Sequence, residues 1–202
     1  MPTLLMVLLM GCAPSVTYVI DVAYAPLIKD QPTGQTEVIR IAVIPFEDAR
    51  EKQKGIGERI RITGQIDEFE ARPYPASSAV TDTLLSALKI QGYQPVIAPR
   101  GKDPAIIAEG SSSKIVLSGR IEKLWAEAVS KPGHTDIKTK VSLKVAIYNA
   151  SDKSTRTITV ESQSEPQAVL FSPAILQNAI NETLTEVINK LLTQLPSAVL
   201  TQ

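Results

Sequence analysis

The stretch that decides the fold is residues 137–147, which read Ile-Lys-Thr-Lys-Val-Ser-Leu-Lys-Val-Ala-Ile. The odd positions are apolar except for Thr139, and Lys138, Lys140 and Lys144 stand among the even positions. A period of two is the spacing of a β-strand that has one buried face and one wet face. Such a strand is typical of an antiparallel sheet covered on a single side.

Two more strands are predicted on either side of this stretch. Residues 114–128 alternate in the same way until Leu124, where the phase shifts, and the shift predicts a β-bulge near Lys123. A turn at residues 131–134 then joins them to residues 137–147. Residues 155–163 return as a Thr-rich strand, so that the three segments form an antiparallel meander.

Earlier segments predict further strands of a mixed sheet. Residues 38–46, Val-Ile-Arg-Ile-Ala-Val-Ile-Pro-Phe, are β-branched and almost wholly apolar, as in an interior strand with both faces buried. Residues 58–69 are expected to form a weaker strand or one arm of a hairpin, and residues 93–98 a short strand that pairs in parallel. Alternation from Val16 to Tyr24 indicates a short strand added to a sheet edge.

Two long amphipathic helices complete the predicted domain. Ser77 or Ser78 is expected to cap a helix that ends before Gly92. Ser172-Pro173 begins the other helix, whose apolar stripe runs up to Pro196. We therefore predict an α+β fold with one mixed sheet of about five strands, including the meander, and both helices packed on one face.

The composition limits the classes of function. The 202 residues suit one domain, and 21 basic residues balance 21 acidic residues, so the basic surplus of a nucleic-acid binder is missing. The chain has one Cys and one His, too few for a disulfide framework or a structural zinc site. We see no nucleophile–base pair and no cofactor motif, and expect a protein that is not an enzyme, with no metal and no cofactor.

The N-terminus contains the most informative short motif. The apolar run from Leu4 to Met10 is too short for a membrane span, which needs about 20 residues, but suits a signal peptide. Leu9-Met10-Gly11-Cys12 resembles a bacterial lipobox, which implies cleavage before Cys12 and lipid attachment to its sulfur. Two features depart from the usual lipobox: Met10 is bulkier than the usual residue at its position, and no basic residue precedes Lys29. Ala13 after the cysteine implies, by the same resemblance, the outer rather than the inner membrane. The alternative is a buried N-terminal strand with a core cysteine.

These features divide the chain into four parts. Residues 1–11 are the predicted signal peptide, and residues 12–36 the lipidated cysteine and a tether. Residues 37–196 form the predicted single domain in the periplasm, and residues 197–202 a C-terminal tail.

A few side chains are candidates for binding. Glu47, Asp48 and Arg50 follow an interior strand, where α/β folds often place functional groups, so they form either a binding loop or a salt-bridged loop. We expect Trp125 in the core, with an anchor for a partner as the alternative. The Lys138, Lys140 and Lys144 stripe either meets anionic lipid or glycan or keeps an exposed sheet face soluble.

Other short motifs have plain structural interpretations. His134 is expected to be an exposed hairpin residue. Gly55-Ile56-Gly57 lacks the residues of a phosphate-binding loop, and we expect a turn there.

The combination resembles the YajG-like family of bacterial lipoproteins. The matching pieces are Cys12, the strand ending near Phe46, Asp48-Ala49-Arg50 with Ile56-Gly57, a helix closed by Gly92-Tyr93, the strand from Lys140 to Ile147, and the last helix. The resemblance implies an outer-membrane, lipid-anchored periplasmic domain without catalysis.

Two functions remain open at this point. In the first, the protein is a non-catalytic lipoprotein that binds an envelope protein through an exposed sheet edge or loop. The alternative is a carrier of lipid or another small hydrophobic ligand in an envelope ABC-type transport system, with an apolar groove between helices and sheet. In both, the lipid on Cys12 attaches the chain to the membrane, and no nucleic acid is bound.

Overall fold

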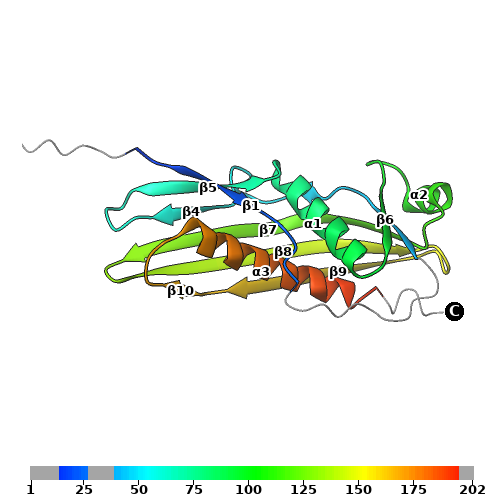
Figure 1. The fold of residues 1–202 in the computed structure, drawn as a ribbon. Coiled ribbons are helices and arrows are strands. Elements are labelled where there is room, and N and C mark those ends of the chain that lie inside the picture. Colours follow the sequence, from blue (N-terminus) through cyan, green and yellow to red (C-terminus); the bar gives the residue numbers. More distant parts are fainter. Residues whose placement is uncertain (1–13, 27–38, 196–202) are drawn as a thin grey trace, which may run out of the picture.

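The computed structural model describes residues 14–26 and 39–195, which form one mixed sheet of ten strands and three helices (Figure 1). The strands are β1 (Thr17–Asp21), β2 (Arg40–Val43), β3 (Glu47–Asp48), β4 (Gly57–Ile60), β5 (Ile66–Arg72), β6 (Gln94–Ile97), β7 (Ile115–Lys131), β8 (His134–Asn149), β9 (Ser154–Ser164) and β10 (Gln167–Ala168). The helices are α1 (Ala76–Ile90), α2 (Pro104–Ser111) and α3 (Pro173–Leu192).

Strand β7 organises the sheet because it is 17 residues long and pairs along both edges. The antiparallel strand β8 follows one edge for the full length of β7. The other edge is shared by β2, β3 and β4, which pair with it in parallel, one after another. β6 then extends the sheet beyond β2, β5 and β1 extend it beyond β4, and β9 and β10 extend it beyond β8.

The α+β class is confirmed, but the expected number of about five strands is wrong. The three long strands of the meander are present, and the interior strand at residues 40–43 is buried on both faces, as predicted. The additional strands have two to seven residues each. Segments this short have few residues in which to show a period. β3, β4 and β10 pair with the long strands β7 and β8, whereas β1, β5 and β6 pair with other short strands.

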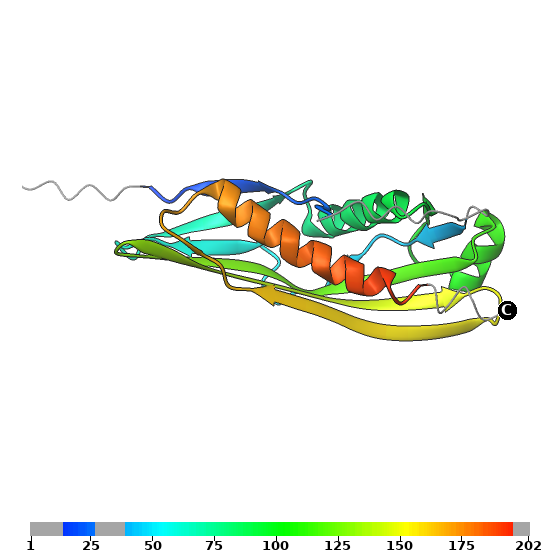
Figure 2. The same cartoon turned by 60° about the horizontal axis from the view of Figure 1, so that its bottom comes forward.

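Both long helices pack on one face of the sheet, as predicted (Figure 2). The main core lies beneath them, where Leu84 and Leu88 of α1 and Leu184 and Ile188 of α3 are at most 1% exposed. The short helix α2 covers the opposite face at one end, because its Ile107 packs in a separate cluster with the sheet residues. Among the described residues, no helix has the length and apolar character that a membrane crossing requires.

One local prediction is confirmed along the meander, and one outside it is corrected. The register of β7 and β8 shifts between Ile121 and Lys123, where the β-bulge was expected. Residues 58–69, expected to form a weaker strand or one arm of a hairpin, instead belong to both arms of the hairpin of β4 and β5.

The helix ends also agree closely with the sequence. The side chain of Ser172 accepts a hydrogen bond from the Ala174 backbone N–H, and Gly92 after α1 has a φ of +83°. α1 itself begins at Ala76, slightly before the predicted serine caps, without a side-chain cap.

The strand expected within the predicted tether is β1, which pairs in parallel with β5 at the sheet edge. One side of α3 holds the chain that follows β1. The Asn181 side chain bonds the Asp21 carbonyl and the Ala23 N–H, both at 3.0 Å. Gln177, Thr185 and Asn189 accept bonds from Asp21, Ala25 and Tyr24, and together with Asn181 they are spaced four residues apart along the same side of α3. Residues 14–26 are therefore part of the domain, whereas the predicted signal peptide, Cys12 and the tail lie outside the described residues.

Candidate functional site

The predicted loop at residues 47–50 divides into two parts with different surroundings. Asp48 and Arg50 form a bidentate ion pair, in which the Arg50 Nε and Nη2 donate to the two carboxylate oxygens at 2.8 and 2.7 Å. Arg50 is 6% exposed. Its guanidinium also donates to the carbonyls of Gly55, Leu124 and Gln53.

The charge of Asp48 is fixed by its partner. Burial alone would raise the pKa of the Asp48 carboxyl, but the hydrogen bonds and the positive charge of Arg50 outweigh it and hold the pKa below its ordinary value. The Asp48 carboxyl is therefore ionised at neutral pH, and both of its oxygens accept from Arg50. Asp48 and Arg50 are therefore a structural ion pair, as in the salt-bridged alternative.

This ion pair closes the loop between β3 and β4 onto β7. Leu124, whose carbonyl accepts from Arg50, follows the β-bulge directly. Gly55 has a φ of +67°, and a Cβ at this position would lie 2.6 Å from the Phe69 carbonyl oxygen. A Cβ on Gly57 would lie 2.0 Å from the Ala126 carbonyl oxygen, so the loop can approach the sheet this closely only with glycine. The turn expected at residues 55–57 is thus the end of this loop, where the backbone packs directly against β5 and β7.

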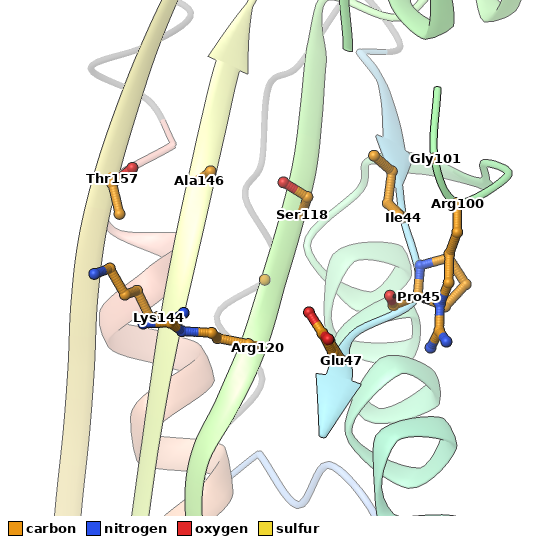
Figure 3. A pocket seen from close by; sticks show the side chains of 11 residues that line it. Ile44, Pro45, Glu47, Arg100, Gly101, Ser118, Arg120, Lys144, Ala146 and Thr157 are labelled. Carbon is orange, nitrogen blue, oxygen red and sulfur yellow. Dashed lines mark hydrogen bonds between the residues drawn. The ribbon is translucent and has the colours of Figure 1, made fainter. Parts of the chain in front are cut away.

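Glu47 lies on the other side of β3 and faces the sheet surface that α1 and α3 leave open (Figure 3). The register places Glu47 beside Arg120 of β7, Arg120 opposite Lys144 of β8, and Lys144 opposite Thr159 of β9. One row therefore crosses four strands, and its two central members are both positively charged.

This row borders a shallow concavity of about 530 Å³. Its charged lining residues are Glu47, Arg100, Arg120 and Lys144, and Ser118 and Thr157 add hydroxyl groups (Figure 3). Arg100 is held in place because its Nη2 donates to the Phe46 carbonyl at 2.6 Å. With three cationic groups and one carboxylate, the concavity suits an anionic group better than a neutral or cationic one.

A second concavity of about 650 Å³ adjoins the first, and Arg120 lines both. It contains Trp125, which was expected in the core. The structure corrects that expectation, because Trp125 is only half-buried and lies on the open face, with the Lys52 Nζ 4.8 Å from its ring centroid. The neighbouring Leu124 and Ala126 point into the core instead.

We call the two concavities together the open-face site, defined by Glu47, Lys52, Arg100, Arg120, Trp125 and Lys144. Of the residues predicted for binding, the structure brings Glu47, Trp125 and Lys144 to this site. Arg50 also lines the second concavity, but its guanidinium is engaged by Asp48, which lines neither concavity.

The other predicted residues lie elsewhere. Lys138 is exposed 3.8 Å from Glu165, and His134 begins β8 at the turn from β7, as expected for a hairpin residue. In the described ranges, no group of three or more His, Cys, Asp or Glu side chains is placed to hold a metal ion.

Sequence reasoning missed Arg100 and Arg120. A signal for Arg120 does exist, because pairing outward from the predicted turn at residues 131–134, with one extra residue at the predicted bulge, sets Arg120 opposite Lys144. No such signal exists for Arg100, since it reaches the site from the loop after β6.

Comparison with known proteins supports the fold. No family model and no curated protein matches the chain. A Xanthomonas campestris protein of family DUF330 is similar in structure, with 15% identity, a TM-score of 0.56, and coverage of 92% of this chain and 97% of that chain.

Two further solved structures align more weakly. A Helicobacter pylori homolog of a neuraminyllactose-binding hemagglutinin is 12% identical, with a TM-score of 0.49 over 87% of this chain and 92% of that chain. Lipoprotein GNA1162 from Neisseria meningitidis is 10% identical, with a TM-score of 0.41 over 77% of this chain and 99% of that chain. The likeness to the Xanthomonas campestris protein shows a shared fold across almost the whole chain.

Proposed function

We propose that this chain is a non-catalytic bacterial envelope lipoprotein, attached to the outer membrane through Cys12, that binds an acidic segment of a partner protein at the open-face site. The resemblance to YajG-like lipoproteins belongs to the same proposal. One observation carries the partner-binding role: Arg120 and Lys144 stand directly opposite each other on a sheet face that the long helices do not cover.

The electrostatics of that pair favour an anionic partner. Like charges opposite each other on adjacent strands destabilise a sheet, and Glu47 and Glu122 offset only part of the charge. A carboxylate-rich segment laid across the strands would relieve the repulsion. The adjoining Trp125 supplies the kind of aromatic side chain that dominates protein interfaces.

The packing of the domain disfavours the alternative, a lipid or hydrophobic-ligand carrier. Such a carrier needs an apolar groove between helices and sheet. In this structure that space is filled by side chains of both helices, including Leu84, Leu88, Leu184 and Val187, which are at most 1% exposed. Both concavities of the open-face site carry charged side chains instead.

Photocrosslinking in the native envelope tests the partner-binding role. A photoreactive residue at Thr157, which is exposed at the open-face site, is expected to capture a protein, and the capture should be lost in Arg120→Glu/Lys144→Glu. The matched control carries the photoreactive residue at Glu182, which is exposed on α3 on the helix side. Equal capture from both positions would contradict the proposal, and a phospholipid retained by the purified protein in native mass spectrometry would favour the carrier.

Lipid attachment has its own test. Cys12→Ala should abolish the incorporation of labelled fatty acid into the full chain, because the thiol is the proposed acceptor. A second variant, in which an ordinary cleavable secretory leader replaces residues 1–12, should move the protein from the membrane to the soluble periplasmic fraction. Labelled Cys12→Ala protein, or a leader-swapped chain that stays in the membrane, would show that the attachment is of another kind.

A further inference from the structure

Four segments that are far apart in the sequence meet at one end of the sheet (Figure 1). The chain entering β1 lies beside the start of β5, because the Val16 N–H donates to the Asp67 Oδ1 at 3.0 Å and the Val16 carbonyl accepts from Glu68. The turn between β4 and β5 projects from the same place.

The turn between β7 and β8 and the loop after β10 lie at this end too. Ile60 at the end of β4 is level with Val129, just before the β7–β8 turn. Ala168 of β10 pairs with Thr135, just after that turn. We call these four segments the anchor end: residues 14–16, 61–66, 131–134 and 169–172.

The anchor end carries exposed apolar side chains on several of its segments. Val16, Ile62, Ile66, Val169 and Leu170 are 39%, 66%, 48%, 77% and 77% exposed, respectively. Large exposed aliphatic side chains grouped in this way mark a surface that meets a protein or a membrane.

The charged groups at the anchor end are paired. The Arg61 Nη2 lies 2.7 Å from the Asp67 Oδ1, and the Lys131 Nζ lies 2.6 Å from the Asp136 Oδ2. The tip between β4 and β5, Ile62-Thr63-Gly64-Gln65-Ile66, has no charged residue. The end can therefore approach an apolar phase without leaving these charges unpaired.

The position of Cys12 decides what covers this end. Val16 is fixed to the hairpin base by Asp67, and Cys12 precedes Val16 by only four residues, a span of at most about 14 Å. A lipid on Cys12 inserted into a bilayer therefore keeps the anchor end close to the membrane surface.

We infer that the anchor end is a membrane-contact surface, in which Ile62, Ile66, Val169 and Leu170 enter the interfacial region of the bilayer that holds the Cys12 lipid. This inference rests on the proposed lipidation. Apolar contacts of this kind add to the lipid anchor and fix the orientation of the domain. The site around Arg120 then stands roughly 35 Å from the membrane-facing turn, since 11 residues of β7 separate Arg120 from Lys131.

The single cysteine allows a direct test on the full chain in its membrane. With the Cys12 thiol lipidated, Ile62→Cys supplies one free thiol for an environment-sensitive fluorophore. Ile97→Cys is the matched control, because Ile97 is also 66% exposed but lies near the start of β7, roughly 40 Å from Ile60 along the strand direction. The label at position 62 should show blue-shifted emission and quenching by a lipid-bound quencher, whereas the label at position 97 should be quenched by iodide only.

The outcomes separate this inference from the lipidation itself. Iodide quenching at both positions, in protein that carries fatty acid and sediments with the membrane, would overturn the membrane-contact surface and leave the lipid anchor in place. Protection of position 62 from both quenchers would assign the surface to a protein, either a second copy or a partner. Chains without fatty acid that remain soluble would overturn both proposals together.

Discussion

Arg50 is 6% exposed, yet its guanidinium reaches acceptors on Asp48 and on the backbone carbonyls of Gln53, Gly55 and Leu124. These acceptors belong to the two ends of one loop and to the strand beneath it. The planar fork of arginine can satisfy several acceptors at fixed angles, and a lysine ammonium cannot reproduce that geometry. The side chain therefore fixes the loop that follows β3, while Glu47 is placed by the pairing of β3 with β7.

Replacement of this arginine by lysine tests that role. We expect Arg50→Lys to lower the free energy of unfolding by about 3 kcal/mol, because it leaves Asp48 and three backbone carbonyls poorly paired. Urea denaturation measures the change. Arg156→Lys is the control, since Arg156 is exposed and this substitution should lower the free energy of unfolding by less than about 0.5 kcal/mol. Equal losses in the two variants would contradict the structural role.

Trp125 shows how far the burial of a single residue could be predicted from the sequence. The phase shift at Leu124 correctly placed Leu124 in the core, and strict alternation after it directs Trp125 outward. Its size and apolar character favour burial, and the prediction followed size. For a strand residue after a bulge, the phase of the pleat is therefore the better guide, since it is set by the backbone.

At the scale of the element, one side of α3 packs in the core and another side hydrogen-bonds the chain that follows β1. Its apolar stripe was evident from the sequence and packs in the core as predicted. The row Gln177, Asn181, Thr185 and Asn189 was missed, although its spacing of four is equally visible in the sequence. Polar residues beside an apolar stripe are usually solvated, and only the three-dimensional arrangement shows that residues 21–25 cover them.

This row leads to a prediction about local stability. Asn181→Ala removes two hydrogen bonds to the backbone, and we expect a loss of about 1–3 kcal/mol that is concentrated in the chain after β1. The substitution should increase the hydrogen-exchange rates of the Ala23 and Ala25 amides more than those of the amides in β8. Asn178→Ala, at an exposed position of the same helix, should leave these amides unchanged. A uniform change over the whole domain would contradict a local role.

At the scale of the whole molecule, the class of fold was predictable but the layout of the sheet was not. Alternation identified β7 and β8 because long strands with one wet face show it clearly, and the Thr-rich composition after a turn identified β9. The sharing of one edge of β7 by β2, β3 and β4 depends on pairings between distant segments. Residue patterns within each strand do not encode those pairings.

Acid stability is a property of the molecule that follows from its buried ion pairs. Burial would raise the pKa of Asp67, but hydrogen bonds from Arg61 and from the Val16 backbone N–H outweigh it and lower the pKa, as Arg50 does for Asp48. A carboxyl with a lowered pKa in the folded state stabilises the fold fully above its unfolded pKa, and the contribution is lost as the pH falls through the folded value.

We therefore expect the free energy of unfolding to stay nearly constant from neutral pH to about pH 4 and to fall below it, since free aspartate has a pKa of about 3.9. Urea denaturation at a series of pH values across this range measures the free energy of unfolding. Asp67→Asn should be less stable than the parent at pH 7 and should lose less stability on acidification. A stability that falls between pH 7 and 5 would point to other groups.

The bonds between β1 and α3 also set the order in which the chain can complete its fold. Asp21 meets Gln177 across 156 positions, and Ala25 meets Thr185 across 160. Closing so long a loop costs entropy before any contact repays it, and topologies dominated by such contacts fold slowly. β5 pairs with β1 after only about 50 residues of chain, but residues 21–25 gain their bonds to α3 only when this much later helix has been made. The edge strand β1 can therefore join the sheet early, whereas the chain that follows it is locked in place late, when α3 packs on the sheet.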